Sequence, residues 1–409
     1  MTRTGIRFRP PQIAIPAEVD WVLARVFGAP SDVSEPSNEI DPQKATEVAG
    51  RIGLRARIRA RNPRLQLGGE LGEKAFAVFD LDFHQAVATS LQQEAVLRQI
   101  AVTASELQIR PVALKGVALR LMGIVSDGSR PSGDIDLLVP RDRAQALWDA
   151  LVGSGCRPSK ISPPTYHLEL LSHPLGSAVE VHTELPGVQL KGVSNATVDQ
   201  CLEADLLLSA PDPFGEYLVP SRGLLAAHLL AHGLGQHGKS PELYPAFQLL
   251  ADLQDLGFSP TGGRDLPVEV FNWVDRGVSP QEVSATVGLL GELESGRQAS
   301  AILQSRGAHT TVLDHFLAGV LSHDYLYELK LSRQLGSGGP RRRLREIFWN
   351  SWRAVWLTNV QIRILYGEPK SALGYLGWRL WRPFELIGRT VRAVWGALKL
   401  RIRRRIAIR

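Results

Sequence analysis

The sequence predicts an α+β protein in which a small mixed sheet with flanking helices precedes a mostly helical C-terminal half. Three observations lead to this prediction. The run at residues 134–139 alternates two carboxylates with apolar side chains, as a strand buried on one face does. Residues 166–171 and 177–182 alternate in the same way on either side of a turn at residues 173–176. Beyond residue 199, apolar residues recur mainly at helical spacing.

Four regions follow from these patterns and from shifts in composition. We predict an N-terminal helical region at residues 1–80, a core containing the sheet at residues 81–200, a helical domain at residues 201–335 and a basic amphipathic tail, rich in Trp and Arg, at residues 341–409. The run Gly-Ser-Gly-Gly-Pro between the last two regions ends regular structure. A chain of 409 residues is long enough for several domains with sizeable cores.

In the N-terminal region, helical spacing predicts helices at residues 18–27 and 43–62, separated by a linker rich in Ser, Pro and Asp. The second half of the 43–62 helix is basic. We expect an exposed basic face there rather than a nucleic-acid-binding arm, because no aromatic side chains are interleaved with the arginines. A longer amphipathic helix at residues 81–107 leads to the core.

The core is expected to start with a strand at residues 112–114, followed by a Lys-Gly turn and a helix at residues 117–122. Residues 127–133 are rich in Asp, Gly, Ser and Pro and predict a flexible loop before the 134–139 strand. A helix at residues 141–152 should follow that strand.

After the strand at residues 177–182, Pro186 and Gly187 are expected to end extended structure. Residues 199–260 should then be helical, apart from a loop around two prolines. Ser221 is placed to cap the N-terminus of one helix, and Asp252 should lie on the polar side of another. The helices expected in this half span residues 221–233, 245–256, 268–273, 280–293 and 311–335.

Asp134 and Asp136 are the first candidates for chemistry. Side chains alternate across a strand, so both carboxylates point to one side while Ile135 and Leu137 point to the other. Two adjacent carboxylates suit a hard cation such as Mg²⁺ or Mn²⁺, which keeps its other positions for water and phosphate oxygens. In the later strand, Glu180 likewise shares a face with the residue two positions on.

These residues stand in a recognisable order: Leu-Lys-Gly at 114–116, Arg130, Asp-Ile-Asp-Leu-Leu-Val at 134–139 and Val-Glu-Val-His at 179–182. The stretch resembles the nucleotidyltransferase superfamily that includes DNA polymerase β. More closely, it resembles the bacterial branch known as uncharacterised nucleotidyltransferases. The resemblance is strongest over residues 81–185 and continues weakly to about residue 257.

The resemblance implies a polymerase β-like nucleotidyltransferase core with a catalytic, metal-binding triad of Asp134, Asp136 and Glu180. His182 is a candidate for orienting Glu180 or contacting substrate; the alternative is a histidine that packs at the end of the strand. Glu184 lies on the same face if the strand continues and is therefore a reserve ligand. The wider superfamily has Gly-Ser or Gly-Gly at the glycine turn, whereas this chain has Lys-Gly-Val. The phosphates of the nucleotide must therefore be bound by other groups, for which the candidates are Lys115, Gly116, Ser129 and Arg130.

Three histidines lie close together further along the chain. His228 and His232 are four residues apart on one helix face, and His237 follows. Such spacing can bind zinc, but no acid lies between the first two and no further ligand is evident. The family resemblance favours a different role, in which this helix packs beside the core and shapes the pocket for an acceptor substrate.

Charge is divided unevenly along the chain. The tail at residues 341–409 has 17 basic and 3 acidic residues, which leaves 30 basic and 38 acidic residues in residues 1–340. The tail also holds six of the nine tryptophans but no apolar run long enough to cross a bilayer. We expect it to bind an anionic membrane surface; packing on the acidic body and, less favoured, nucleic-acid binding are the alternatives.

Together these features predict a Mg²⁺- or Mn²⁺-dependent enzyme that transfers NMP from an NTP such as ATP to an unidentified hydroxyl or phosphate acceptor. Envelope, polysaccharide and natural-product metabolism are the settings considered. Two cysteines and an N-terminus without a secretory pattern favour the cytoplasm, with the tail at the inner membrane. The alternative is a catalytically inactive protein of the same fold that serves as a binding or scaffold protein at the membrane surface.

Overall fold

Alternation of buried and polar side chains produces a mixed sheet in the computed structural model of the protein. The structure describes residues 16–28, 40–159, 166–236, 246–258, 264–274, 278–299, 301–302, 376–377 and 380–381. The chain divides into two compact units, residues 1–159 with 163–326 and residues 160–162 with 327–409. All but four described residues belong to the first unit. The predicted helix at residues 311–335 and nearly all of the predicted tail lie outside the described residues.

Seven strands form one sheet in the order β3-β4-β5-β2-β1-β9-β8, and β6 and β7 form a separate hairpin. The neighbours β2 and β5 run parallel, as do β1 and β9, whereas the other pairs are antiparallel. The strands are β1 (Val112–Ala113), β2 (Asp134–Leu138), β3 (Arg157–Pro158), β4 (Leu171–Ser172), β5 (Ala178–His182), β6 (Leu185–Leu190), β7 (Val193–Ala196), β8 (Leu207–Ser209) and β9 (Leu218–Pro220). The predicted α+β class with a mixed sheet and flanking helices is confirmed.

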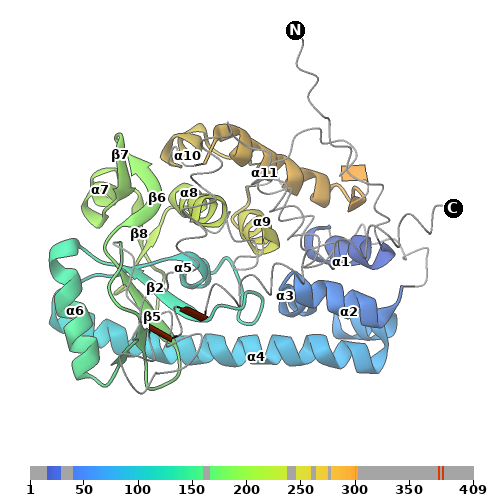
Figure 1. Cartoon of the computed structure of the whole chain (residues 1–409), viewed down its shortest axis with the longest axis horizontal. Coiled ribbons are helices and arrows are strands. Elements are labelled where there is room, and N and C mark those ends of the chain that lie inside the picture. The colour runs from blue at the N-terminus through green and yellow to red at the C-terminus, as the bar shows by residue number, and fades with distance from the viewer. Residues whose placement is uncertain are drawn as a thin grey trace, which may run out of the picture. The chain divides into compact units, whose positions relative to one another are not determined.

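Helices flank this sheet (Figure 1). Along the chain they come before, between and after its strands. Several begin with the predicted kind of cap: the Ser221 side chain accepts a hydrogen bond from the Leu224 backbone N–H at the start of α8. The helices are α1 (Ala17–Phe27), α2 (Pro42–Arg51), α3 (Arg55–Arg61), α4 (Arg64–Glu106), α5 (Lys115–Leu121), α6 (Arg141–Gly153), α7 (Val198–Glu203), α8 (Arg222–Leu230), the π-helical turn η1 (Ala231–Gln236), α9 (Ala246–Asp255), α10 (Val268–Trp273) and α11 (Pro280–Glu294). No helix in the described part of the chain is long and apolar enough to cross a membrane.

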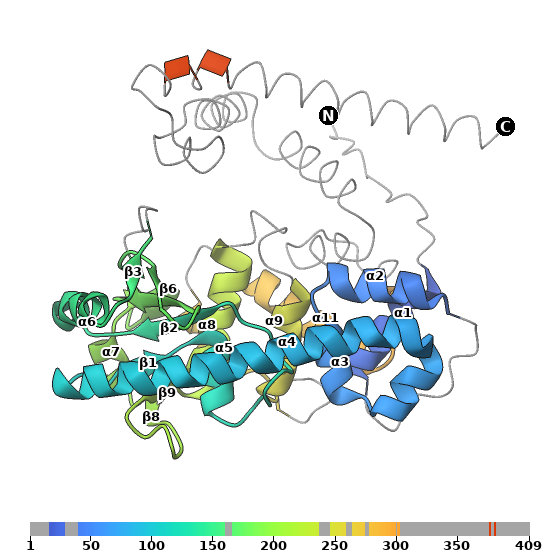
Figure 2. The same ribbon diagram turned by 90° about the horizontal axis from the view of Figure 1, so that it is seen from below.

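Helix α4 runs past both the sheet and the N-terminal helices (Figure 2). It is 43 residues long and bends at Gly72, whose φ of 71° is non-helical. It starts well before the predicted residue 81, and its C-terminal half buries Val96, Leu97 and Ile100. The Tyr217 hydroxyl, just before β9, donates a 2.6 Å hydrogen bond to the Leu97 carbonyl and so ties this half to the sheet.

Several local predictions were wrong. Of the strand predicted at residues 166–171, only Leu171 lies in a strand, β4, and the helix predicted at residues 43–62 is two helices, α2 and α3. Pro186 and Gly187 do not end extended structure, because both lie inside β6, where a bulge and the positive φ of Gly187 accommodate them. Residues 199–260 are not wholly helical, since β8 and β9 form an antiparallel pair. The basic helix α3 does not present an exposed basic face. Arg57 is 1% exposed, and the basic groups of α3 pair with acids of α4 and α9.

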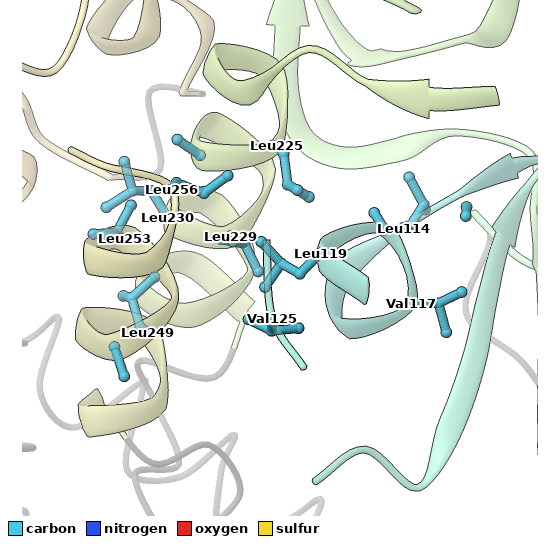
Figure 3. Close-up of a cluster of buried hydrophobic side chains, with 14 of the residues drawn as sticks. Leu114, Val117, Leu119, Val125, Leu225, Leu229, Leu230, Leu249, Leu253 and Leu256 are labelled. Atoms are coloured by element: carbon cyan, nitrogen blue, oxygen red, sulfur yellow. The ribbon is translucent and has the colours of Figure 1, made fainter. Parts of the chain in front are cut away.

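Helices α5, α8 and α9 pack side by side through aliphatic side chains (Figure 3). Leu229 and Leu230 of α8 lie between Leu119 of α5 and the leucines of α9, Leu249 and Leu253. These side chains are at most 1% exposed. This apolar packing fixes α9 relative to the turn that joins β1 to α5.

Candidate functional site

The parallel pairing of β2 with β5 brings the predicted acids together. Asp136 lies opposite Glu180, and Leu138 lies opposite His182. Because successive side chains alternate in both strands, the polar residues share one face of the sheet. The residues between them on β2 and β5 are fully buried: Ile135, Leu137, Val179 and Val181. The two-residue spacing in the sequence thus becomes a polar surface built from two adjacent strands.

Three of these side chains have the spacing of a metal site. One ligand atom from each of Asp136, Glu180 and His182 lies within 4.8 Å of the others. His182 Nε2 is 3.0 Å from Asp136 Oδ1 and 3.3 Å from Glu180 Oε2. Asp136 and His182 are 2% exposed at their side chains, and Glu180 is 23% exposed. Two carboxylates and an imidazole are a donor set that fits a divalent cation, including Mn²⁺.

Asp134 stands beside this trio on the same face of β2. Its Oδ1 is 3.2 Å from Ser132 Oγ, which also donates to the Asp134 carbonyl. The charge of Asp136 and then burial raise the pKa of Asp134. Asp134 and Asp136 repel each other when both carboxylates are ionised, so a cation between them would be stabilised.

Lys115 reaches the same carboxylate from the start of α5. Its Nζ is 2.7 Å from Asp136 Oδ1, and its side chain is 13% exposed. Its backbone has a φ of 48°, in the left-handed region that a non-glycine residue seldom adopts. The Leu114 N–H donates to the Asp136 carbonyl, which anchors the chain just before this turn to β2.

Neighbouring cations set the charge of Asp136. Burial opposes its ionisation, yet the Lys115 ammonium and the His182 ring hold the pKa of Asp136 well below its usual range. Burial opposes the charge on His182 too, but hydrogen bonds to Asp136 and Glu180 raise the pKa of His182. Asp136 is therefore a carboxylate that Lys115 and His182 already hold in place. A metal ion there would compete with Lys115 for it.

Two other residues predicted to bind phosphate, Arg130 and Ser129, make their hydrogen bonds to groups other than the acids of the site. Arg130 is bound to Asp252 of α9: its Nε is 2.9 and 3.0 Å from the two carboxylate oxygens, and its Nη2 is 2.8 Å from Oδ2. Its Nη1 packs against Gly116, where an added Cβ would lie 2.0 Å from that nitrogen. Ser129 Oγ donates a 2.7 Å hydrogen bond to the Ser126 carbonyl within its own turn. Among the residues predicted to bind phosphate, Lys115 is the one whose side chain contacts an acid of the site, Asp136.

Glu184 lies beyond the end of β5, so strand alternation does not extend to it. Its carboxylate is 3.7 Å from the Arg141 guanidinium at the start of α6, and its side chain is 21% exposed. The trio formed by Asp136, Glu180 and His182 does not include Glu184.

The histidines of the helical region are not part of this trio. His228 is fully buried on α8, and neither ring nitrogen has a hydrogen-bond partner among the described residues. Burial, followed by the charges of Lys115 and His182, lowers the pKa of His228 to about 3. The His228 and His232 rings are 6.0 Å apart. Across the described residues the metal-like group is the trio alone, and His237 lies outside them.

Sequence analysis missed two neighbours of the site. Tyr166 stacks on His182 with ring centroids 6.1 Å apart and an interplanar angle of 11°, and His167 lies 5.2 Å from the same ring. Asp252 is fully buried, not on a polar surface as predicted. No sequence pattern indicated the aromatic pair, because Tyr166 and His167 precede β4 and His167 meets His182 through an isolated β-bridge. No local pattern marks Asp252, because its partners lie 122 and 195 residues away in the chain.

Comparison with known families gives one match. Residues 38–256, more than half of the chain, match the model of a family described as uncharacterised nucleotidyltransferase. This range includes both strands of the site, the Lys115 turn and the Asp252 helix. Neither the curated proteins nor the solved structures yielded a match to this chain.

Proposed function

Because this chain belongs to the uncharacterised nucleotidyltransferase family, we propose that it transfers NMP from an NTP to a hydroxyl or phosphate acceptor. The observation that carries the proposal is the β2–β5 register, which gathers Asp134, Asp136 and Glu180 on one face beside Lys115. Converging carboxylates with a lysine at their edge suit the recognition of a metal-chelated triphosphate.

The trio of Asp136, Glu180 and His182 fits a divalent cation such as Mg²⁺ or Mn²⁺. In the proposed enzyme Asp136 and Glu180 of this trio would hold the ion, together with Asp134 on the same face of β2. When bound, such an ion neutralises the triphosphate and polarises the α-phosphate. Lys115 is the side chain placed to meet phosphate oxygens once it leaves Asp136. His182 holds Asp136 and Glu180 through its Nε2 and so keeps both carboxylates oriented.

In the proposed reaction an acceptor oxygen forms a bond to the α-phosphorus while the bond to the bridging oxygen of the leaving group breaks. Pyrophosphate departs, and the proton of an acceptor hydroxyl passes to a base. Glu180 is partly exposed, so an acceptor entering from solvent can reach its carboxylate. Tyr166 and His167 contact the His182 ring, and in the proposed enzyme they would line the pocket for the acceptor.

The NTP and the acceptor are proposed only as classes. ATP is the first nucleotide to test, and envelope, polysaccharide and natural-product precursors are the first acceptors. We further propose that the protein works in the cytoplasm and that residues 341–409 bring it to an anionic membrane surface, as their basic, Trp-rich composition suggests.

The experiment follows each labelled NTP with Mg²⁺ or Mn²⁺ and a set of candidate acceptors or cell lysate. The matched control is the Asp134→Asn, Asp136→Asn double variant, whose side chains keep their shape while losing their charge. Metal-dependent label transfer that the double variant lacks is the expected result. Label transfer that persists in the double variant would place the chemistry in another site or another protein.

A second function has one observation in its favour. Lys115 and His182 already neutralise Asp136, so the site is stable without a bound cation. A scaffold protein that retained this fold without catalysis would show the same contacts. It would consume no NTP, and Mg²⁺ or Mn²⁺ would not raise its melting temperature, whereas the transferase should be stabilised by either ion.

A further inference from the structure

A buried network of charges leads from the N-terminal helices to the glycine beside Lys115. Arg57 of α3 is 1% exposed, and its guanidinium lies 3.2 Å from Asp252 Oδ1. Asp252 is fully buried and also accepts a 2.6 Å hydrogen bond from Gln248 Nε2. The same carboxylate holds Arg130 from the loop before β2. Three segments distant in sequence therefore meet at one side chain of α9.

Arg130 connects Asp252 to the turn at Lys115 and Gly116. Its Nε and Nη2 face the two oxygens of Asp252, an arrangement that fixes the plane of the guanidinium. The remaining nitrogen, Nη1, lies against Gly116, where there is no room for a Cβ. The backbone immediately after Lys115 thus rests on a guanidinium whose orientation Asp252 sets.

That turn needs such support, because Lys115 adopts a left-handed backbone conformation. On one side, the Leu114 N–H is bound to the Asp136 carbonyl. On the other, Gly116 packs on Arg130. Between these two anchors the Lys115 side chain reaches Asp136 at 2.7 Å. A shift of Arg130 would therefore move Lys115 relative to the acids.

We propose that Asp252 is a positioning residue for the active site, which acts through Arg130 and Gly116 to hold Lys115 where it meets the phosphates of the nucleotide. This inference rests on the proposed function. It also explains why charged groups occupy this interior position, since buried ion pairs on their own contribute little net stability compared with apolar packing. Arg130 then acts beneath the turn and not on the nucleotide.

Helix α9 is well suited to this task. Its apolar side, with Leu249 and Leu253, packs on α8, and α8 in turn packs on α5 (Figure 3). Asp252 projects from the same helix to Arg130. Rigid packing on one side and a charge-assisted, two-point contact on the other fix the distance from α9 to the Lys115 turn.

The test compares Asp252→Asn with Asp255→Asn. Asp255 is a matched control, because it pairs with Arg57 and Arg61 of the same network, whereas Asp252 pairs with Arg130. Two readouts are taken on the full chain. One is kcat/KM for the NTP. The other is the rate at which acetic anhydride acetylates Lys115, followed by mass spectrometry with the exposed Lys191 as internal reference.

Asp252→Asn should lower kcat/KM by roughly 10- to 100-fold, the range expected from displacing a contact group by about an ångström. In this variant acetic anhydride should also acetylate Lys115 several-fold faster than in the wild type, because the ammonium is no longer held against Asp136. Asp255→Asn should change neither value. If Asp252→Asn leaves both Lys115 acetylation and kcat/KM at the values of the control, the inference is overturned.

A conservative change on the partner guards against misfolding. Arg130→Lys keeps the charge but loses the two-point contact, so it should reproduce the Lys115 acetylation effect. Combining it with Asp252→Asn should add little to either single change, since both act through one contact. Simple addition of the two effects in kcat/KM would contradict the proposal and would indicate instead that Arg130 binds the phosphates directly.

The acetylation readout separates this inference from the proposed function. If the wild-type chain consumes no NTP under any condition, the transferase proposal fails. Faster acetylation of Lys115 in Asp252→Asn, with Asp255→Asn unchanged, would still support the positioning role. Equal acetylation in both variants would overturn that role even if the wild type proves to be an active transferase.

Discussion

At the residue scale, Lys115 contacts the Asp136 carboxylate and is proposed to bind the triphosphate as well. Lys115→Met keeps the length of the side chain and removes its charge. We expect KM for the NTP to rise about 10-fold, equivalent to about 1.4 kcal/mol, because one cation no longer meets the phosphates. Mn²⁺ should bind at least as tightly as before, because the Lys115 ammonium no longer competes for Asp136. Steady-state kinetics and calorimetric Mn²⁺ titration measure the two effects. Weaker Mn²⁺ binding would show that Lys115 supports the metal site instead of competing with it.

His228 gives a pH dependence whose sign is fixed by its burial. Because burial lowers the pKa of His228 from 6.5 to about 3, the unfolded chain binds a proton between these values that the folded chain does not. Stability is therefore lost as the pH falls through this window, by about 1.4 kcal/mol per pH unit from this residue alone. Denaturant unfolding at pH 7.5 and 5.0 should show a smaller difference for His228→Leu than for the wild type. Parallel pH profiles would contradict the assignment of this loss to His228.

At the element scale, the packing of α8 between α5 and α9 decides whether the proposed positioning contact can form. Leu229 is fully buried in this packing. We expect Leu229→Ala to lower the free energy of unfolding by about 2–5 kcal/mol through lost transfer energy and a cavity. Leu202→Ala, at a position 50% exposed on α7, should change it by less than about 0.5 kcal/mol. Urea unfolding compares the two variants. Equal losses would show that the three-helix packing contributes nothing beyond ordinary surface burial.

Local periodicity predicted the elements that carry the acids. The period of two placed Asp134 and Asp136 on one face, and the same rule paired Glu180 with His182. The N-terminal cap at Ser221 and the helix after β2 were predicted for local reasons also. Local rules failed where distant segments decide the structure. β8 and β9 have three residues each and form through their mutual pairing. Arg57 of α3 is buried because two acids of α9 neutralise it.

The same limit applies to the site. The strand pattern indicated which residues share the polar face of the sheet, but it held no information on the Lys115–Asp136 contact or on the Arg130–Asp252 pair. The first depends on a left-handed turn at a lysine, which sequence rules do not favour. The second joins residues 122 positions apart, and Asp252 has the spacing of an ordinary surface acid on an amphipathic helix.

At the scale of the whole molecule, charge is separated between a tail with a net charge of +14 and a remainder of −8. We expect the full chain to sediment with vesicles containing anionic phospholipid at low salt and to be released as salt is raised. Replacing Arg401, Arg403, Arg404 and Arg405 with Gln should weaken this binding by about 1 kcal/mol per charge near the surface. Binding to neutral vesicles that is as strong as to anionic ones would exclude the electrostatic role. Stronger binding to RNA or DNA than to vesicles would favour the nucleic-acid alternative.

The order of the sheet also governs when the molecule becomes complete during synthesis. β1 pairs with β9, Val112 with Leu218, so the sheet cannot close until more than a hundred further residues have been made. Asp252 emerges from the ribosome later still, well after the strands that carry the acids. The residues that pair β2 with β5 are therefore made before the residue that holds Arg130. If α9 positions Lys115, the Lys115 turn reaches its final position only once the first unit has folded through α9.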